Sequence, residues 1–190
     1  MKISVEQFVA QNIPGYKQSE IKLPFEITDM NCAADFVLTG YGEIEDKLYF
    51  LREGIAQVNT LKGEEERILE FVFPGTFFCA YTSYLQQLPS DVEIVAVTKC
   101  VVSKISRGDL ENAVTSSLLA SHVSLHIARQ MFLARARREK DFLTLSAEER
   151  YLALMRRAPE VIQLIPINKI AKYLGIQPES LSRIRKSVIP

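Results

Sequence analysis

The stretch from Asp109 to Ala158 contains neither glycine nor proline, and it restricts the possible folds more than any other part of the chain. A run of this length without a helix breaker predicts a long helix, with Asp109 as the expected N-cap residue. Apolar and small residues recur along it at alternating spacings of four and three, the a/d pattern of paired helices. This seam comprises Val114, Leu118, Ser121, Leu125, Ala128, Phe132 and Arg135.

Two interpretations of the seam remain open. A helix that lies on its own β-domain also needs an apolar stripe. Ser121 and Ala128 are small, however, and small residues at alternating seam positions let two helices approach closely. We therefore favour a homodimer. Its expected interface consists of Val114, Leu118, Ser121, Leu125, Ala128 and Phe132.

A strand-rich region lies before this helix, from about residue 38 to 105. The runs KLYFLREGIAQVN and ERILEFVF are rich in β-branched and aromatic residues, and the polar turn around Gly63 separates them. Short strands at close spacing predict a small antiparallel barrel or sandwich. The residues up to about Phe36 are expected to form short helices, the first opened by Ser4 and Gln7 at capping-box spacing.

The composition is that of a globular protein, with 47% hydrophobic and 24% charged residues. No apolar run reaches the roughly 18–20 residues of a membrane span. The N-terminal residues lack the apolar core of a signal peptide, which predicts a cytoplasmic protein. Cys32, Cys79 and Cys100 are odd in number and lack CxxC spacing, so we expect reduced thiols rather than a disulfide or zinc framework.

The formal net charge of zero conceals a strong asymmetry. Residues 1–128 carry 10 Lys and Arg against 17 Asp and Glu, whereas residues 129–190 carry 13 against 6. A polyanion would therefore be repelled by the first part and attracted by the second. Charge alone is weak evidence for nucleic-acid binding, because a charged segment is usually a solvated face.

Two short helices around a glycine turn end the chain, in KIAKYLGIQPESLSRIRK. An amphipathic helix capped by Ser146 comes before them, and Pro159 and Pro166 bracket a short connection. Gly175 suits the turn, and Gln177 caps the second helix. The expected inner face contains Ile167, Ile170, Ala171, Leu174, Leu181 and Ile184; the outer face contains Gln177, Glu179, Ser180, Arg183 and Lys186. This pattern is typical of a DNA-binding helix-turn-helix, although a compact helical cap would share it.

With DKLYFLREGIAQV, PGTFF and IAKYLGIQPESLSRIRK in this order, nearly the whole chain resembles the Crp/Fnr family of transcription regulators. The resemblance implies an α+β fold: an N-terminal double-stranded β-helix or jelly-roll sensor barrel (residues 1–108), a long dimerisation helix (109–138) and a C-terminal helix-turn-helix domain (139–190). It also implies that Arg183, Glu179, Gln177 and Ser180 face base edges, while Lys169, Arg185 and Lys186 contact phosphate.

The sequence departs from the family where cyclic-nucleotide binders hold their ligand. An ungapped alignment puts Cys79-Ala80 at the family's Gly-Glu pair and Ser90-Asp91 at its Arg-Ser pair. Losing the arginine removes a charge-assisted phosphate contact. We therefore expect no cyclic AMP binding, and either another small effector or none. The candidate pocket comprises Gly75, Phe78, Cys79, Ala80, Tyr81, Ser90, Asp91 and Arg135.

Other chemistry has little support in the sequence. His122 and His126 have metal-binding spacing, but no third ligand is evident, so we expect no metal and no cofactor. Cys79 is either a redox sensor or, as we favour, an inert buried thiol. No catalytic constellation stands out, so we do not expect an enzyme. The alternative to a DNA-binding regulator is a sensor or interaction module that retains the fold.

Overall fold

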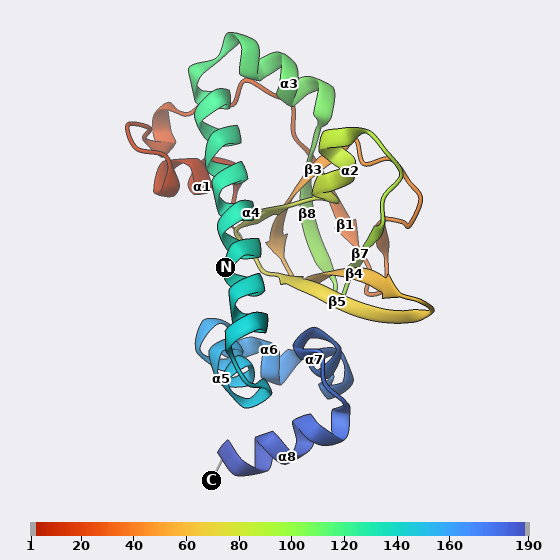
Figure 1. The fold of residues 1–190 in the computed structure, drawn as a ribbon. Helices are drawn as coiled ribbons and strands as arrows, with labels where there is room; N and C mark the ends of the chain where they lie inside the picture. The colour runs from red at the N-terminus through yellow and green to blue at the C-terminus, as the bar shows by residue number, and fades with distance from the viewer. Residues whose placement is uncertain (1–2, 189–190) are drawn as a thin grey trace.

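The computed structural model describes residues 3–188, with the side chains of all of these except Glu20 and residues 160–162. A β-sandwich, a long helix and a group of shorter helices follow one another along the chain (Figure 1). The sandwich is preceded by α1 (Val5–Asn12) and a single 3-10 turn, η1 (Gln18–Glu20).

Two four-stranded antiparallel sheets form the sandwich. The first has the order β1-β8-β3-β6 and consists of β1 (Thr28–Cys32), β8 (Cys100–Ser106), β3 (Lys47–Glu53) and β6 (Thr76–Phe78). The second has the order β2-β7-β4-β5 and consists of β2 (Val37–Thr39), β7 (Val92–Ala96), β4 (Ala56–Lys62) and β5 (Glu65–Val72). The α+β prediction is confirmed, with two sheets that do not close into a barrel.

The local turns and caps of the first half mostly agree with the sequence patterns. Ser4 and Gln7 form both hydrogen bonds of the capping box, at 3.2 and 2.9 Å. Gly63 takes a positive φ of 64° in the β4–β5 hairpin. One expectation here is wrong: residues 28–32 form strand β1 rather than a helix. TDMNC lacks a long β-branched run, and the pairing of all five of its residues with β8 is what makes it a strand.

The sandwich core continues onto the long helix. Phe8 of α1 contacts Phe50 and Phe77 edge-on, with ring centroids 5.6 and 5.1 Å apart. Val123 and Ile127 of the long helix are buried in the same apolar cluster. The helix therefore lies on its own sandwich along one face, but Val123 and Ile127 are not members of the predicted seam.

The expected single helix through the dimerisation segment 109–138 is wrong, because the chain breaks at Ser117. The segments are α3 (Arg107–Ser116) and α4 (Leu118–Thr144). Ser117 has extended backbone angles, and its hydroxyl accepts from the Ala120 N–H. Serine competes with helical hydrogen bonding in this way, which a search for glycine and proline misses. The N-cap of α3 is Ser106 rather than Asp109, since the Ser106 hydroxyl accepts from the Asp109 N–H at 3.0 Å.

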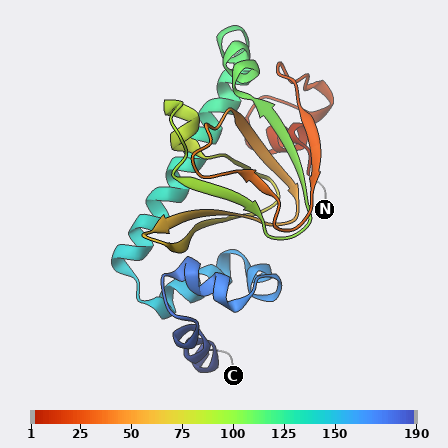
Figure 2. The same ribbon diagram turned by 90° about the vertical axis from the view of Figure 1, so that its right-hand side faces the viewer.

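Four helices complete the chain beyond a second break at Leu145–Ser146. They are α5 (Ala147–Arg157), α6 (Pro159–Leu164), α7 (Ile167–Leu174) and α8 (Pro178–Val188). The Ser146 capping box and the left-handed Gly175 turn (φ 71°) are as expected. The connection between Pro159 and Pro166 is itself helical, as α6. Figure 2 shows this C-terminal unit beneath the sandwich, next to the β4–β5 hairpin.

The C-terminal unit shares apolar contacts with the sandwich. Ile55, Ile68 and Phe71 of the sandwich pack in one buried cluster with residues of α5, α7 and α8. We call this cluster the junction core. Its buried members from the C-terminal unit are Tyr151, Leu154, Ala158, Ile165, Ile170, Ala171, Leu174 and Leu181. The C-terminal unit is therefore packed against the sandwich, with α7 next to β5, in addition to the covalent link through α4.

Candidate effector pocket and nucleic-acid interface

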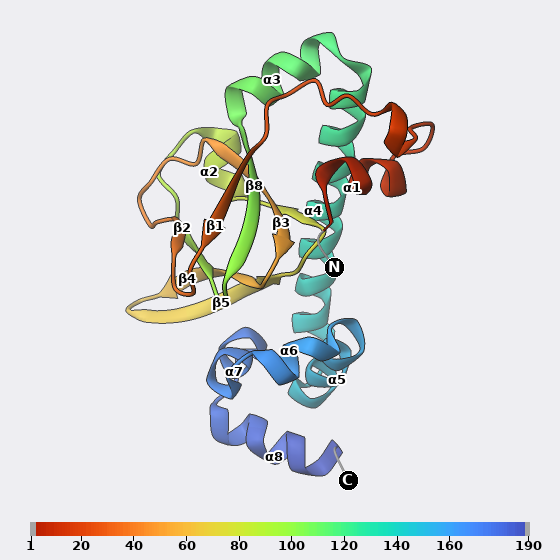
Figure 3. The ribbon, with the colours of Figure 1, turned by 180° about the vertical axis from the view of Figure 1, so that it is seen from behind.

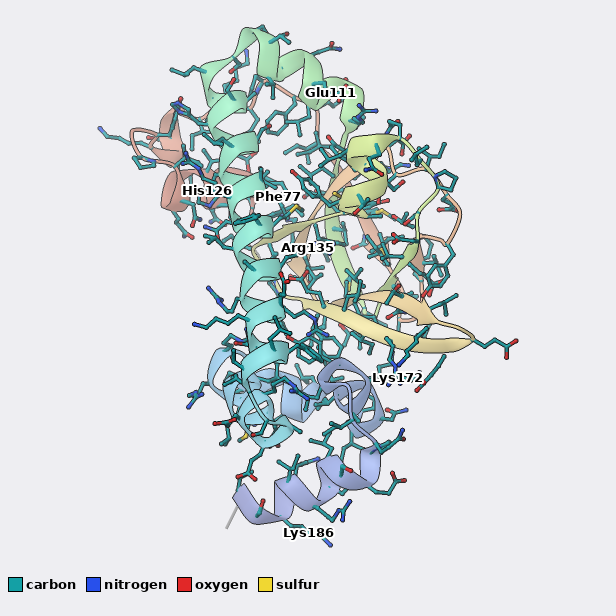
Figure 4. The ribbon with its side chains drawn as sticks, viewed as in Figure 1. Phe77, Glu111, His126, Arg135, Lys172 and Lys186 are labelled. Atoms are coloured by element: carbon teal, nitrogen blue, oxygen red, sulfur yellow. The ribbon has the colours of Figure 1, made fainter. Side chains whose placement is uncertain are left out.

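A cavity of about 1100 Å³ lies between β5, β6 and α4 and extends to α5 and α7. It brings together five of the eight residues predicted for the effector pocket. These are Gly75, Phe78, Cys79, Tyr81 and Arg135. Figure 4 labels Phe77, His126 and Arg135, which also line it. Arg135 thus supplies a cation to the cavity from the long helix.

The other three predicted pocket residues do not line the cavity. Ser90 is buried, and its hydroxyl both donates to the Val92 carbonyl at 2.7 Å and accepts from the Val92 N–H at 3.2 Å. Asp91 is exposed on the approach to β7. Ala80 is buried just before the short helix α2 (Tyr81–Gln86). Neither side chain at the family's arginine-serine positions is available to a ligand in the cavity.

Glu45 is a buried carboxylate beside this pocket that the sequence patterns did not reveal. Its side chain accepts from the Thr39 hydroxyl at 2.6 Å, from the Ala80 N–H at 3.2 Å and from the Lys47 N–H at 3.1 Å. Burial raises the pKa of Glu45, while these hydrogen bonds oppose the rise. The backbone N–H that opens α2 is therefore already occupied by an acidic side chain of the protein itself.

Cys79 is in an environment that disfavours its reactive form. Burial raises the pKa of Cys79 well above its usual value, and the Glu45 charge raises it further, whereas Arg135 acts in the opposite direction. The thiolate is the nucleophilic form of cysteine. Such a thiol stays protonated at neutral pH, which agrees with the expectation that Cys79 is an unreactive buried thiol.

Basic side chains, among them Arg138 of α4, line the end of the cavity nearest the C-terminal unit. The Arg138 guanidinium donates to the carbonyls of Ile68 and Tyr173 at 2.9 and 3.0 Å. It also lies over the rings of Tyr173 and Phe142, 4.2 and 4.7 Å from their centroids. Arg138 therefore joins three elements, β5, α4 and α7, with one side chain.

Two further electrostatic interactions lie near Arg138, between the sandwich, α4 and the C-terminal unit. Lys172 of α7 forms an ion pair with Glu66 of β5 at 2.8 Å. Burial raises the pKa of Glu70, against the opposing charges of Arg135, Arg138 and Arg157. The contact between sandwich and C-terminal unit is thus polar at its rim and apolar in the junction core.

The helical pair α7–α8 has the two faces that the sequence predicted. Ile170, Ala171, Leu174 and Leu181 are buried, while Ile167 and Ile184 are partly buried against them. The outer residues Gln177, Glu179, Arg183 and Lys186 are exposed, and Lys169, Ser180 and Arg185 are partly exposed. Lys186 projects from α8 at the end of the molecule away from the sandwich (Figure 4).

The predicted dimer seam is divided between two helices. Val114 lies on α3 and packs against the sandwich core, so it is not part of a continuous seam. Ser121 donates its hydroxyl to the Val114 carbonyl at 2.9 Å, which stabilises the α3–α4 bend. Leu118, Leu125 and Phe132 of α4 are 68%, 48% and 71% exposed, and Ala128 is partly exposed between them.

The two histidines of α4 contact different side chains. The Tyr16 hydroxyl lies 3.4 Å from His122 Nδ1, and the ring of His126 packs edge-on against Phe8. Within residues 3–188, no group of three His, Cys, Asp or Glu side chains is placed to hold a metal ion. Nor does any helix of the described chain combine the length and apolarity that crossing a membrane would need.

Residues 31–117 match the family model for the cyclic nucleotide-binding domain. Among proteins of curated function, none matches the sequence. FixK2 from Bradyrhizobium japonicum is similar in structure, with a TM-score of 0.72, 20% identity, and coverage of 86% of this chain and 84% of FixK2. The c-di-GMP responsive global regulator CLP of Xanthomonas campestris has a TM-score of 0.65 at 16% identity, and the match covers 85% of this chain and 86% of CLP.

A third structure, described as a Crp/Fnr-family transcriptional regulator from Eubacterium rectale, has a TM-score of 0.68 at 12% identity. It covers 97% of this chain and 82% of its own. These likenesses extend over the sandwich, the long helix and the C-terminal unit together. Residues 31–117 are therefore similar to the cyclic nucleotide-binding domain, and the chain as a whole shares its fold with solved regulators such as FixK2 and the Crp/Fnr-family protein.

Proposed function

We propose that the chain is a homodimeric, DNA-binding transcription regulator, and not an enzyme, that acts in the cytoplasm. The observation that carries this proposal is the α7–α8 pair, whose inner face is buried and whose outer face exposes Arg183 and Lys186. The surplus of basic residues beyond residue 128 supports the same conclusion. In functional terms the chain divides into a sensor (1–108), a dimerisation segment (109–138) and a DNA-binding domain (139–190).

In this proposal α8 is the helix that lies in the major groove. Arg183 donates to guanine, and Glu179 accepts from cytosine N4, with Gln177 and Ser180 beside them. Lys169, Arg185 and Lys186 contact phosphate.

Selection of bound sequences from a random duplex pool tests the proposal. Arg183→Ala should weaken binding to the selected duplex by about 1–3 kcal/mol and relax the preference at one base pair. Lys186→Ala is the matched control: it should weaken binding to all duplexes alike and reduce the salt dependence by about one counterion. Equal specific binding by wild type and Arg183→Ala would refute the assignment of α8. Failure to bind any duplex at low salt would favour the non-DNA interaction module instead.

The dimer that we propose pairs α4 with its copy. Leu118, Leu125 and Phe132 form an exposed apolar stripe along the helix face that the sandwich does not cover. An isologous pairing of these stripes with the two α4 helices parallel would place both α8 helices on one side of the dimer. DNA sites should then be inverted repeats with half-sites about one helical turn apart.

For the sensor pocket we propose that cyclic AMP and cyclic GMP do not bind. Ser90 uses its hydroxyl on Val92, Asp91 adds a negative charge, and Glu45 occupies the Ala80 N–H. Arg135 opposes this proposal, since it supplies a cation to the cavity, and so do the backbone N–H groups after Gly75, which also lines the cavity, since they could cradle a phosphate. The volume would accept another small effector. Titration calorimetry with each cyclic nucleotide should show no saturable heat; a dissociation constant below about 100 μM, roughly −5.5 kcal/mol, would contradict the proposal.

A further inference from the structure

Two cysteines from distant parts of the chain lie opposite each other in the first sheet. Cys32 is the last residue of β1 and Cys100 the first of β8, and they are register partners in the antiparallel ladder. Figure 3 shows these strands side by side. Both side chains are buried on the inner face, 4% and 3% exposed. The remaining cysteine, Cys79, lies beyond β6, next to α2.

This register satisfies the backbone requirement for a disulfide. Directly opposed residues of an antiparallel pair have Cα atoms about 4.5–5.5 Å apart and Cβ atoms at a similar distance. A disulfide needs Cα atoms about 4.4–6.8 Å apart and Cβ atoms about 3.5–4.5 Å apart. The two Cβ atoms would therefore have to approach by no more than about 1 Å. Both residues are at strand ends, where such a shift disturbs little of the ladder.

The bond would displace little in the reduced structure. The Cys100 Sγ lies 3.3 Å from the carbonyl oxygens of both Ile55 and Thr98, and its one S–H can donate to either. Such S–H hydrogen bonds are weak, so turning the sulfur toward Cys32 costs little. Gly54 covers Cys100, since a Cβ there would meet the Cys100 Sγ at 2.7 Å.

Small reagents have a route to the pair. A surface pocket of about 320 Å³ is lined by both cysteines together with Asn31, Ala33, Glu53, Lys99 and Val101. Burial raises the pKa of both Cys32 and Cys100, so most of each thiol is protonated at neutral pH and oxidation is slow rather than absent.

We propose that Cys32 and Cys100 form a reversible cross-strand disulfide when the protein meets a hydroperoxide. One thiolate attacks the peroxide oxygen, giving a sulfenic acid and releasing water or an alcohol. The second sulfur attacks the sulfenic sulfur, forms the S–S bond and releases water. The net change with hydrogen peroxide is two thiols and one peroxide to one disulfide and two waters. A dithiol reductant reverses it, becoming a disulfide itself.

The cysteine pair adjoins the junction core. Ile55, whose carbonyl receives the Cys100 thiol, is also a member of the junction core that packs on the C-terminal unit. The disulfide would close a loop of the chain from residue 32 to residue 100, which spans most of the sandwich. Oxidation would thus link β1 covalently to β8, at the end of β8 that contacts Gly54 in the β3–β4 turn.

Peptide mapping tests the pairing directly, because trypsin separates the three cysteines. Cleavage after lysine and arginine gives peptides 23–47, 68–99 and 100–104, with one cysteine each. The folded full-length protein is treated with hydrogen peroxide, the excess is removed with catalase, and free thiols are alkylated in denaturant. We expect peptide 23–47 linked to peptide 100–104 with the loss of two hydrogens, while the Cys79 peptide is alkylated. Dithiothreitol given before alkylation should restore three alkylated peptides.

Two variants complete the test, and a non-reducing gel distinguishes a disulfide within one chain from one between chains. Cys79→Ser should leave the Cys32–Cys100 link intact, whereas Cys32→Ser should abolish it within the monomer. The wild-type map does not depend on either variant folding. Three alkylated cysteines after prolonged oxidation, a link from Cys32 to Cys79, or a link only between chains would each overturn the proposal.

Discussion

Replacing Arg138 with methionine should loosen the C-terminal unit from the sandwich. Methionine keeps an apolar stem of similar length but donates no hydrogen bond. The change therefore removes the donors to the Ile68 and Tyr173 carbonyls, at 2.9 and 3.0 Å, and the cation over Tyr173 and Phe142. It leaves the junction core itself untouched.

The magnitude follows from those contacts. A hydrogen bond from a charged donor contributes about 1.5–3 kcal/mol, and a cation over an aromatic ring about 0.5–1 kcal/mol where it is partly exposed. Water can replace part of each bond, since Arg138 is not fully buried. We therefore expect the free energy of unfolding to fall by about 2–4 kcal/mol, less than the simple sum of the contacts.

Urea unfolding and hydrogen exchange together measure this effect. Arg138→Met should lower the urea midpoint and speed amide exchange in both β5 and α7. Arg150→Met is the matched control, because Arg150 bonds only within the second half of the chain, to the carbonyls of Leu145 and Leu174. It should speed exchange in α7 and α5 but not in β5. A loss of unfolding free energy below about 0.5 kcal/mol, or unchanged amide exchange in β5, would refute the role of Arg138 in holding the C-terminal unit to the sandwich.

Three further changes have distinct expected outcomes. Gly54→Ala should cost about 2–4 kcal/mol in urea unfolding, since φ is +88° and the added Cβ would lie 2.3 Å from the Lys99 carbonyl; Gly63→Ala, at a positive φ in open space, should cost only about 1–2 kcal/mol. Burial raises the Glu45 pKa above its ordinary 4.5, so the charged carboxylate is the disfavoured form in the folded protein. The free energy of unfolding of wild type relative to Glu45→Gln should therefore fall as pH rises from 4 to 7, and a difference that does not change with pH would contradict this. Leu125→Asp should convert the dimer to monomers in sedimentation, whereas a wild-type monomer at tens of micromolar would contradict the α4 pairing.

The strands and caps that rest on local chemistry were predictable from the sequence. The β4–β5 hairpin follows from two β-rich runs around Gly63, and both capping boxes follow from residue types three positions apart. Strand β1 was not predictable, because TDMNC becomes a strand through pairing with β8, a partner about 70 residues away. The break at Ser117 was missed because serine stops a helix by hydrogen bonding, without the signature of glycine or proline.

The pocket was predictable only in part, for a similar reason. An ungapped alignment named Cys79 and Arg135 for the pocket, and the structure places both in the wall of the cavity. It could not show that the Ser90 hydroxyl bonds to Val92, nor that Glu45 reaches the Ala80 N–H across 35 residues of sequence. Contacts of this kind depend on how loops are packed, and a sequence pattern carries no such information.

The junction core has a thermodynamic consequence for any movement of the C-terminal unit. Parting α7 from β5 would bring Ile68, Phe71 and Ile170 into water, and hydration of apolar surface raises the heat capacity. A rearrangement of this kind would carry a positive heat-capacity change, so its equilibrium would be curved in temperature and would differ between cold and warm cells. Temperature itself would then act on the position of α8, with no ligand required.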